Sequence, residues 1–139
     1  MRSITLAKKI AQLTITKKAH DVVFMDLRKV TDMTDFFIVC TADSDVQARA
    51  IADAVEDGTN ELGVSAWHKE GASQGQWILL DYVDIVVHIF HKDVRGFYGI
   101  EKLWNDAKIE AVEDKEEKAA VKKAVRKKSV KKAAVRKKA

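Results

Sequence analysis

The chain has 139 residues and a formal net charge of +4, and its 47% apolar composition predicts one compact domain. Its single cysteine, Cys40, excludes an intramolecular disulfide and fits a reducing compartment. The longest apolar runs fall far short of the roughly 20 residues that a membrane-spanning helix needs, and the N-terminus lacks the apolar core of a secretory signal, so we expect a cytoplasmic protein.

The first third of the chain contains one helical pattern and two strand patterns. Apolar residues recur at helical spacing over residues 3–19, with lysines left for the solvent side. Two apolar runs follow at 21–27 and 36–42, and both have the length and composition of buried strands.

A second helix is expected after the strand at 36–42. Ser44 is followed three residues later by Gln47, which is a capping-box pattern, and Gly63 is a typical residue at a helix end. The residues expected to face inward from this helix are Val46, Ala50, Ile51, Ala54 and Val55.

The second half adds three strand patterns and a helix. Residues 64–70 alternate, and residues 76–82 and 84–90 are apolar runs too close together for a helical crossover, so they predict an antiparallel hairpin. A final helix is expected from 94 to about 107. The resulting order, αββαβββα, predicts an α/β mixed sheet flanked by helices.

The charge divides the chain into a body and a tail. Residues 1–114 hold 13 Lys and Arg against 19 Asp and Glu, whereas residues 115–139 hold 12 against 2. A segment this charged and this poor in large apolar groups builds no core. We therefore expect a domain over residues 1–110 and a disordered basic Lys/Arg/Ala/Val tail over 111–139.

No catalytic constellation stands out from the residues. The six glycines form no phosphate-binding loop, and Cys40 lies in an apolar run, where thiols are usually inert. Two sets of side chains have metal-ligand types, namely His68, Glu70 and His88, and separately Asp26, Asp81 and Asp84. A half-buried histidine bonded to a carboxylate and ordinary turn chemistry explain them better.

The aromatic residues of the 76–82 strand are more informative. Strand alternation places Trp77, Leu79 and Asp81 on one face and the intervening residues on the other. Both faces are largely apolar, so either helices cover both or one face awaits a partner. Tryptophan beside polar groups is a typical interface hot spot, although core packing explains Trp77 about equally well.

Two long segments resemble the Iojap family, the ribosomal silencing factors (RsfS). The first is EGASQGQWILLDYVDIVVHIF followed by an R-x-x-Y-x-x-E-x-L-W pattern at 95–104, and the second is DFFIVCTADSDVQARAIADAV at 35–55. The similarity covers about residues 3–108. The positions that depart from the usual family pattern are Ala42, Val46, Val83 and Lys92, and Val83 stands where the family usually has Gly in the hairpin turn.

The resemblance implies a nucleotidyltransferase-like fold without enzymatic activity, cofactor or metal. It implies binding to the fourteenth ribosomal protein of the large subunit, which blocks joining of the small subunit and represses translation under nutrient limitation. The residues that we expect at this interface are Trp77, Leu79, Asp81, Asp84, His88, Arg95, Tyr98, Glu101 and Trp104.

Other functions remain open on the sequence alone. They are a divergent nucleotidyltransferase-like or metal-dependent enzyme, and a general nucleic-acid binder that acts through the tail. The tail could also add contact with ribosomal RNA to the main interface, and a homodimer of the free protein is left open. The tail cations concerned are Lys122, Lys123, Arg126, Lys127, Lys128, Lys131, Lys132, Arg136, Lys137 and Lys138.

Overall fold

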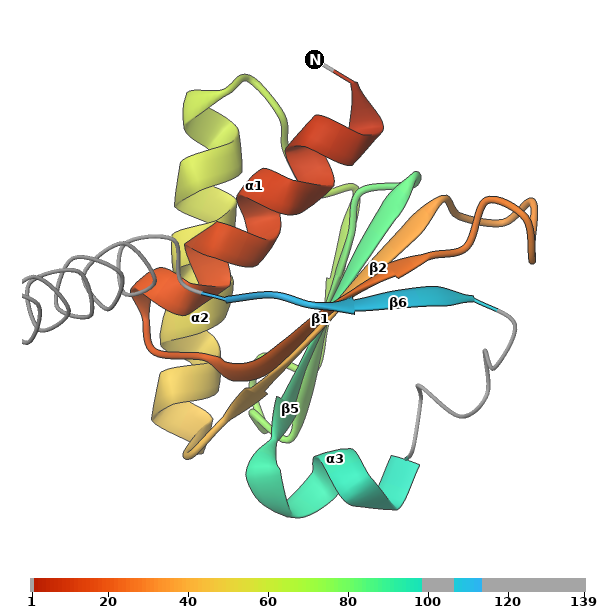
Figure 1. Ribbon diagram of the computed structural model, residues 1–139. Coiled ribbons are helices and arrows are strands. Elements are labelled where there is room, and N and C mark those ends of the chain that lie inside the picture. Colours follow the sequence, from red (N-terminus) through yellow and green to blue (C-terminus); the bar gives the residue numbers. More distant parts are fainter. Residues whose placement is uncertain (1, 99–106, 114–139) are drawn as a thin grey trace, which may run out of the picture.

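The computed structural model describes residues 2–98 and 107–113, and they form a mixed sheet with helices (Figure 1). Helix α1 (Ser3–Thr16) leads to strands β1 (His20–Asp26) and β2 (Phe36–Ala42). Helix α2 (Asp45–Glu61) is followed by β3 (His68–Glu70), β4 (Trp77–Asp81) and β5 (Ile85–His91). Helix α3 (Lys92–Tyr98) and strand β6 (Lys108–Ala111) come last. The predicted α/β mixed sheet flanked by helices is confirmed.

The six strands lie in the order β3-β4-β5-β2-β1-β6. Strands β2 and β5 are parallel, and every other neighbouring pair is antiparallel. The predicted hairpin is confirmed as β4 and β5, in which Trp77 lies opposite Phe90 and Leu79 lies opposite His88. The hairpin therefore brings the aromatic residues of two strands into one cluster.

Helices α1 and α2 lie side by side on one face of the sheet (Figure 1). Each presents an apolar stripe to the strands, and the core between them includes Ile10, Ile51, Ile38 and Leu80, all of them 0% exposed. Burying a side chain of this size contributes about 1.5–3 kcal/mol. This layer is the main core, and it fixes which sides of α1 and α2 face the solvent.

A second, smaller core lies on the opposite face of the sheet. It contains Met25, Leu27, Phe37, Val39 and Phe90, with Trp77, Val86, Val94 and Ala107 packed against it as partly buried members. Helix α3 follows β5 directly and contributes Val94 to this core. The face turned away from α1 and α2 is therefore apolar at its centre.

The turn before β4 contains two glycines, in a backbone conformation that other residues rarely adopt. Gly71 and Gly75 have φ values of +82° and +68°, and the Gly75 N–H donates to the Gly71 carbonyl at 3.0 Å. A Cβ atom on Gly71 would lie 2.0 Å from the Trp77 carbonyl oxygen, and one on Gly75 would lie 2.7 Å from Cβ of Asp45. These glycines let the turn pass close to β4 and to the start of α2.

Several element boundaries differ from the sequence prediction. Helix α1 ends at Thr16, because Lys18 has a positive φ of 65° that an α-helix cannot contain. The strand expected over 64–70 is confined to β3. The helix expected from 94 already begins at Lys92, and residues 99–106 of its expected span lie outside the described residues.

Strand β6 is an element that the sequence prediction lacks. It pairs with β1 in antiparallel register, with Val23 opposite Ala111 and Asp26 opposite Lys108. Its four residues alternate between charged and apolar types, but all four are exposed and the run is too short to stand out as a strand in the sequence. The strand also crosses the boundary at residue 110 where we expected the tail to begin.

The start of α2 confirms the predicted cap and corrects one inward residue. The Gln47 N–H donates to Ser44 Oγ at 3.0 Å, and Gln47 Oε1 accepts from the Asp43 N–H at 2.6 Å. Val46, expected inside, is 66% exposed, because Ala48 and Ala52 face the sheet together with Ile51 and Val55. Ala50 and Ala54 are half-buried at the edge of this stripe.

Candidate docking surface

Strand β4 sends its side chains alternately to the two faces of the sheet. Ile78 and Leu80 point into the main core and are 0% exposed. Trp77, Leu79 and Asp81 point to the opposite face and are half-buried. The predicted alternation is confirmed. Helices α1 and α2 cover the face of the sheet to which Ile78 and Leu80 point, and they leave the face of Trp77, Leu79 and Asp81 uncovered.

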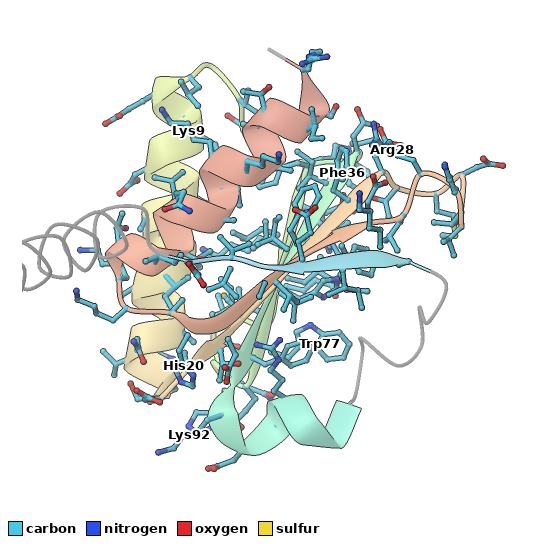
Figure 2. The ribbon with its side chains drawn as sticks, viewed as in Figure 1. Lys9, His20, Arg28, Phe36, Trp77 and Lys92 are labelled. Carbon is cyan, nitrogen blue, oxygen red and sulfur yellow. The ribbon has the colours of Figure 1, made fainter. Side chains whose placement is uncertain are left out.

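Trp77 and His88 form a hydrogen-bonded pair on this opposite face (Figure 2 labels Trp77). The indole Nε1–H donates to His88 Nδ1 at 3.1 Å. Because an indole nitrogen can only donate, Nδ1 of His88 must be an acceptor, and the neutral ring carries its proton on Nε2. The bond fixes both the rotation of the indole and the tautomer of the imidazole.

Aromatic rings surround this pair. The Trp77 ring stacks on Phe90 at a centroid distance of 4.9 Å, and Phe37 meets the His88 ring edge-on at 4.5 Å. His88 is 4% exposed, and Phe90 is 0% exposed. Trp77 therefore packs on the second core as a partly buried residue, and its role as an interface hot spot stays a prediction.

The neighbouring strand β3 adds charge beside Leu79 and Asp81. The register places Glu70 opposite Leu79 and His68 opposite Asp81. His68 Nε2 lies 2.7 Å from Glu70 Oε1, and both side chains are largely exposed. An acidic and imidazole-bearing edge therefore borders the apolar centre of this face.

Asp81 and Asp84 accept hydrogen bonds that hold the turn between β4 and β5. Asp81 Oδ1 accepts from the Val83 N–H at 2.8 Å. The Asp84 carbonyl oxygen accepts from the N–H groups of Asp35 and Phe36 and from Thr34 Oγ1, at 2.9, 3.0 and 3.0 Å. Asp84 is thus placed at the end of the hairpin, outside β5, and the structure does not bring it to His88.

Neither set of potential metal ligands converges. His88 bonds Trp77 and His68 bonds Glu70, whereas Asp26 is held by Arg28 through contacts of 3.0 and 2.7 Å. These bonds from the Arg28 side chain hold the pKa of Asp26 below its usual value. Within residues 2–98 and 107–113, no group of three His, Cys, Asp or Glu side chains could hold a metal ion.

Cys40 is buried in the main core. Burial raises the pKa of its thiol to about 12, because the thiolate would lose its hydration there. At neutral pH the sulfur is therefore a protonated, apolar core group and no nucleophile.

Arg95 has a structural role within α3. One of its terminal nitrogens donates to Thr41 Oγ1 at 2.6 Å and also to the Asp21 carbonyl oxygen. These bonds tie α3 to the end of β2 and to the irregular start of β1, where the pairing with β2 shifts register between His20 and Val23. Sequence reasoning placed Arg95 at the interface and gave no sign of this anchor.

The remaining predicted interface residues are only partly described. Tyr98 is the last residue of α3, and its side chain lies outside the described part of the chain. Glu101 and Trp104 lie outside the described residues altogether, as do the tail cations from Lys122 to Lys138.

Sequence reasoning missed Phe90 as the neighbour of Trp77 and Phe37 as the neighbour of His88. A turn centred between Val83 and Asp84 fixes the hairpin register, so the pairing of Trp77 with Phe90 could have been deduced from turn length. Phe37 lies beside His88 because β2 pairs with β5 in parallel register. No turn links these two strands, so the sequence gives no way to deduce their register.

No helix in the described part of the chain is long and apolar enough to cross a membrane.

The family model for "Ribosomal silencing factor during starvation" matches residues 1–138. The chain is 37% identical over 107 residues to the ribosomal silencing factor RsfS of Bacillus subtilis, covering 77% of this chain and 91% of that protein. It is 42% identical over 91 residues to RsfS of Halalkalibacterium halodurans, covering 66% and 78%.

A solved structure agrees with these similarities. The crystal structure of a Chromobacterium violaceum protein superposes with a TM-score of 0.74 at 34% sequence identity, covering 76% of this chain and 88% of that one. Sequence, family model and fold therefore agree, and the chain belongs to the ribosomal silencing factor (RsfS) family.

Proposed function

We propose that this protein binds the large ribosomal subunit through its fourteenth ribosomal protein and thereby blocks joining of the small subunit in the cytoplasm. The role is steric and non-enzymatic, and it represses translation when nutrients are short. Family membership supports this proposal. The observation that carries it on this chain is the half-buried Trp77, held rigid by His88 and Phe90 on the sheet face opposite α1 and α2.

Rigid aromatic anchors suit a docking surface. Ordering a side chain at an interface costs about 0.5–1.5 kcal/mol, and a side chain that is already fixed avoids most of this cost. The Trp77 indole is fixed by a hydrogen bond and a ring stack before any partner arrives. Leu79 and Asp81 project beside it from the same strand, which gives an apolar centre with a polar neighbour.

Charge favours a basic partner for this surface. Residues 1–114 have six more acidic than basic side chains, and Glu70 and Asp81 border Leu79 on the proposed docking face. Complementary charge speeds encounter with a basic protein and disfavours acidic partners. The docking residues that we propose are those expected from the sequence, and Trp77, Leu79 and Asp81 form their described centre.

Replacing Trp77 with Ala tests this surface directly. We expect Trp77→Ala to weaken binding to purified large subunits at least about tenfold, because truncating an aromatic hot spot typically costs 2 kcal/mol or more. Val46→Ala is the control, since Val46 is 66% exposed at the start of α2, on the other face of the sheet. Circular dichroism checks that both variants fold, and full affinity of folded Trp77→Ala would show that the surface is wrongly placed.

A second variant removes charge without disturbing the fold. Asp81→Asn keeps an oxygen that can accept from the Val83 N–H, so the turn is preserved. We expect its affinity for large subunits to fall mainly at low salt, whereas Asp32→Asn in the exposed 27–35 connection leaves affinity unchanged. Equal effects of both substitutions would reveal only a general dependence on net charge.

The non-enzymatic role has its own test. Titration of the protein with ATP or CTP and magnesium is expected to leave its thermal unfolding midpoint unchanged. A clear rise that Asp81→Asn abolishes would contradict the proposal and favour a nucleotidyltransferase-like enzyme.

We further propose that the tail adds salt-dependent contact with ribosomal RNA, so deleting residues 115–139 weakens large-subunit binding without abolishing it.

A further inference from the structure

Helix α1 and strand β6 enclose a cleft on the helical side of the sheet, and Figure 1 shows β6 passing beside α1. The volume of the cleft is about 340 Å³. Small-molecule sites in proteins commonly measure about 300–1,000 Å³, so this cleft has the size for a small ligand. Its lining residues include Lys8, Ala11 and Gln12 of α1, Phe24 of β1, Glu110 of β6 and Val112 just after β6.

The register of β6 fixes which of its side chains face α1. Glu110 lies opposite Phe24, whose side chain is buried in the main core beneath the helices. Because residues directly opposite each other share a face of the sheet, Glu110 projects toward α1. Val112 packs against the same core. Glu110 and Val112 therefore form one wall of the cleft, and Phe24 lies at its floor.

Helix α1 supplies the opposite wall. Lys8, Ala11 and Gln12 are spaced three and four residues apart, so they share one face of the helix. Ala11 is 1% exposed, which makes the floor beneath Lys8 apolar. Gln12 Nε2 donates to the Glu113 carbonyl oxygen at 2.9 Å. This hydrogen bond ties the helix to the chain just after β6, so the two walls are held together.

The two walls carry opposite charges that do not pair with each other. Lys8 on α1 and Glu110 on β6 are both exposed and both line the cleft. Among the described side chains, the lysines and arginines in ion pairs are Arg28, Arg49 and Lys69, each with another carboxylate. The cleft therefore offers a cation on one wall and a carboxylate on the other, with an apolar floor between them.

This combination selects a class of ligand. The carboxylates of Glu110 and Glu113 would repel a phosphate group or a nucleotide. A purely apolar molecule would take water from both charges without replacing its hydrogen bonds. A molecule with a carboxylate, an ammonium group and a short apolar group meets all three parts of the cleft, and these are the groups of an aliphatic amino acid.

We propose that this cleft binds a free aliphatic amino acid. Lys8 donates to its carboxylate, its ammonium group donates to the Glu110 carboxylate, and its side chain covers Phe24 and Val112. Because the ligand bridges α1 and β6, its binding favours the form of the protein in which β6 is paired. The inference goes beyond the proposed function and does not depend on it, since the cleft and Trp77 lie on opposite faces of the sheet.

An NMR titration of the full-length chain with L-leucine tests the site. Two further probes are matched to leucine, namely leucinamide, which lacks the carboxylate, and isocaproate, which lacks the ammonium group. We expect millimolar leucine to shift the amide signals of Gln12, Glu110 and Val112. Each of the other two probes is expected to bind about three- to fivefold more weakly, as for the loss of one exposed ion pair.

Substitutions on the two walls assign the charges. Lys8→Gln is expected to lose the preference for leucine over leucinamide, and Glu110→Gln the preference for leucine over isocaproate. Both side chains are exposed, so neither change disturbs the core. Lys9→Gln is the matched control, because Lys9 is the exposed neighbour of Lys8 but does not line the cleft, and it should keep both preferences (Figure 2 labels Lys9).

Three results would overturn the inference. The first is the absence of shifts at these amides in millimolar leucine. The second is equal binding of the three probes to the wild type, which would reveal only non-specific contact with an apolar group. The third is the same loss of preference in Lys9→Gln as in Lys8→Gln. Trp77→Ala should bind leucine like the wild type, so failure of the docking proposal and failure of this inference are distinguishable.

Discussion

Val83 lies in the turn between β4 and β5 with a positive φ of 74°. The Asp84 N–H donates to the Tyr82 carbonyl oxygen at 3.0 Å, which closes a three-residue γ-turn around Val83. A β-branched side chain in the left-handed region is strained, because its Cβ crowds the following carbonyl group. The turn keeps this conformation because the hairpin on both sides of it is fully paired.

We therefore expect Val83→Gly to stabilise the fold by about 1 kcal/mol, which is the strain relieved less the chain entropy that glycine adds to the unfolded state. Urea unfolding measures the effect. Val83→Ala is the control, since it removes the branched atoms but keeps Cβ and so most of the strain. A less stable Val83→Gly protein would show that the valine side chain contributes more than its backbone costs.

Gly71 is a second residue whose backbone decides its identity. Gly71→Ala is expected to lower the free energy of unfolding by about 2 kcal/mol or more, because the new Cβ meets the Trp77 carbonyl oxygen and the backbone also has a positive φ. Gly63→Ala is the control: its φ is +77°, but a Cβ there meets nothing within 4 Å. Equal losses at both positions would mean that the close approach to β4 contributes nothing.

At the scale of single elements, Asp26 and Arg28 form an ion pair where β1 ends and the connection to β2 begins. The Arg28 guanidinium donates two bonds to the Asp26 carboxylate and lies over the Phe36 ring at 5.1 Å from its centroid. Because these bonds lower the pKa of Asp26, the pair contributes stability that is present above the unfolded-state pKa of about 3.9 and is lost as the pH falls through the lower folded-state value.

Replacing Asp26 with Asn removes this contribution. Urea midpoints measured between about pH 5 and pH 3 are expected to fall less steeply with pH for Asp26→Asn than for the wild type. Asp32→Asn, at an exposed position in the connection that follows β1, is the control that removes the same charge. A wild-type slope for Asp26→Asn would show that its carboxylate titrates alike in the folded and unfolded protein.

The elements differ in how well their sequences predict them. Strands β1, β2, β4 and β5 are apolar enough to be recognised, because they are buried by the helices or by the second core. Strand β6 was missed, because it forms by pairing with β1 and its alternating pattern is only four residues long. Val46 was placed inward because its periodicity fits two helix faces, and only the packing of α2 on the sheet selects one.

At the scale of the whole molecule, the sheet separates two surfaces of different chemistry. The aromatic and acidic side chains around Trp77 lie on one face, and the cationic helix α1 and the acidic helix α2 lie on the other (Figure 1). Strand alternation alone assigned Trp77, Leu79 and Asp81 to a shared face. It could not show that His88 lies beside Trp77 or that Arg95 binds Thr41, because these contacts depend on strand order and on where α3 docks.

Sedimentation of a mixture of the protein with purified small and large ribosomal subunits tests the central claim most directly. The protein is added to large subunits first, small subunits follow under conditions that favour joining, and the fractions are probed for the protein. The account predicts that the protein sediments with free large subunits, that joined ribosomes become scarce, and that Trp77→Ala restores joining. Joined ribosomes that carry the protein would contradict it.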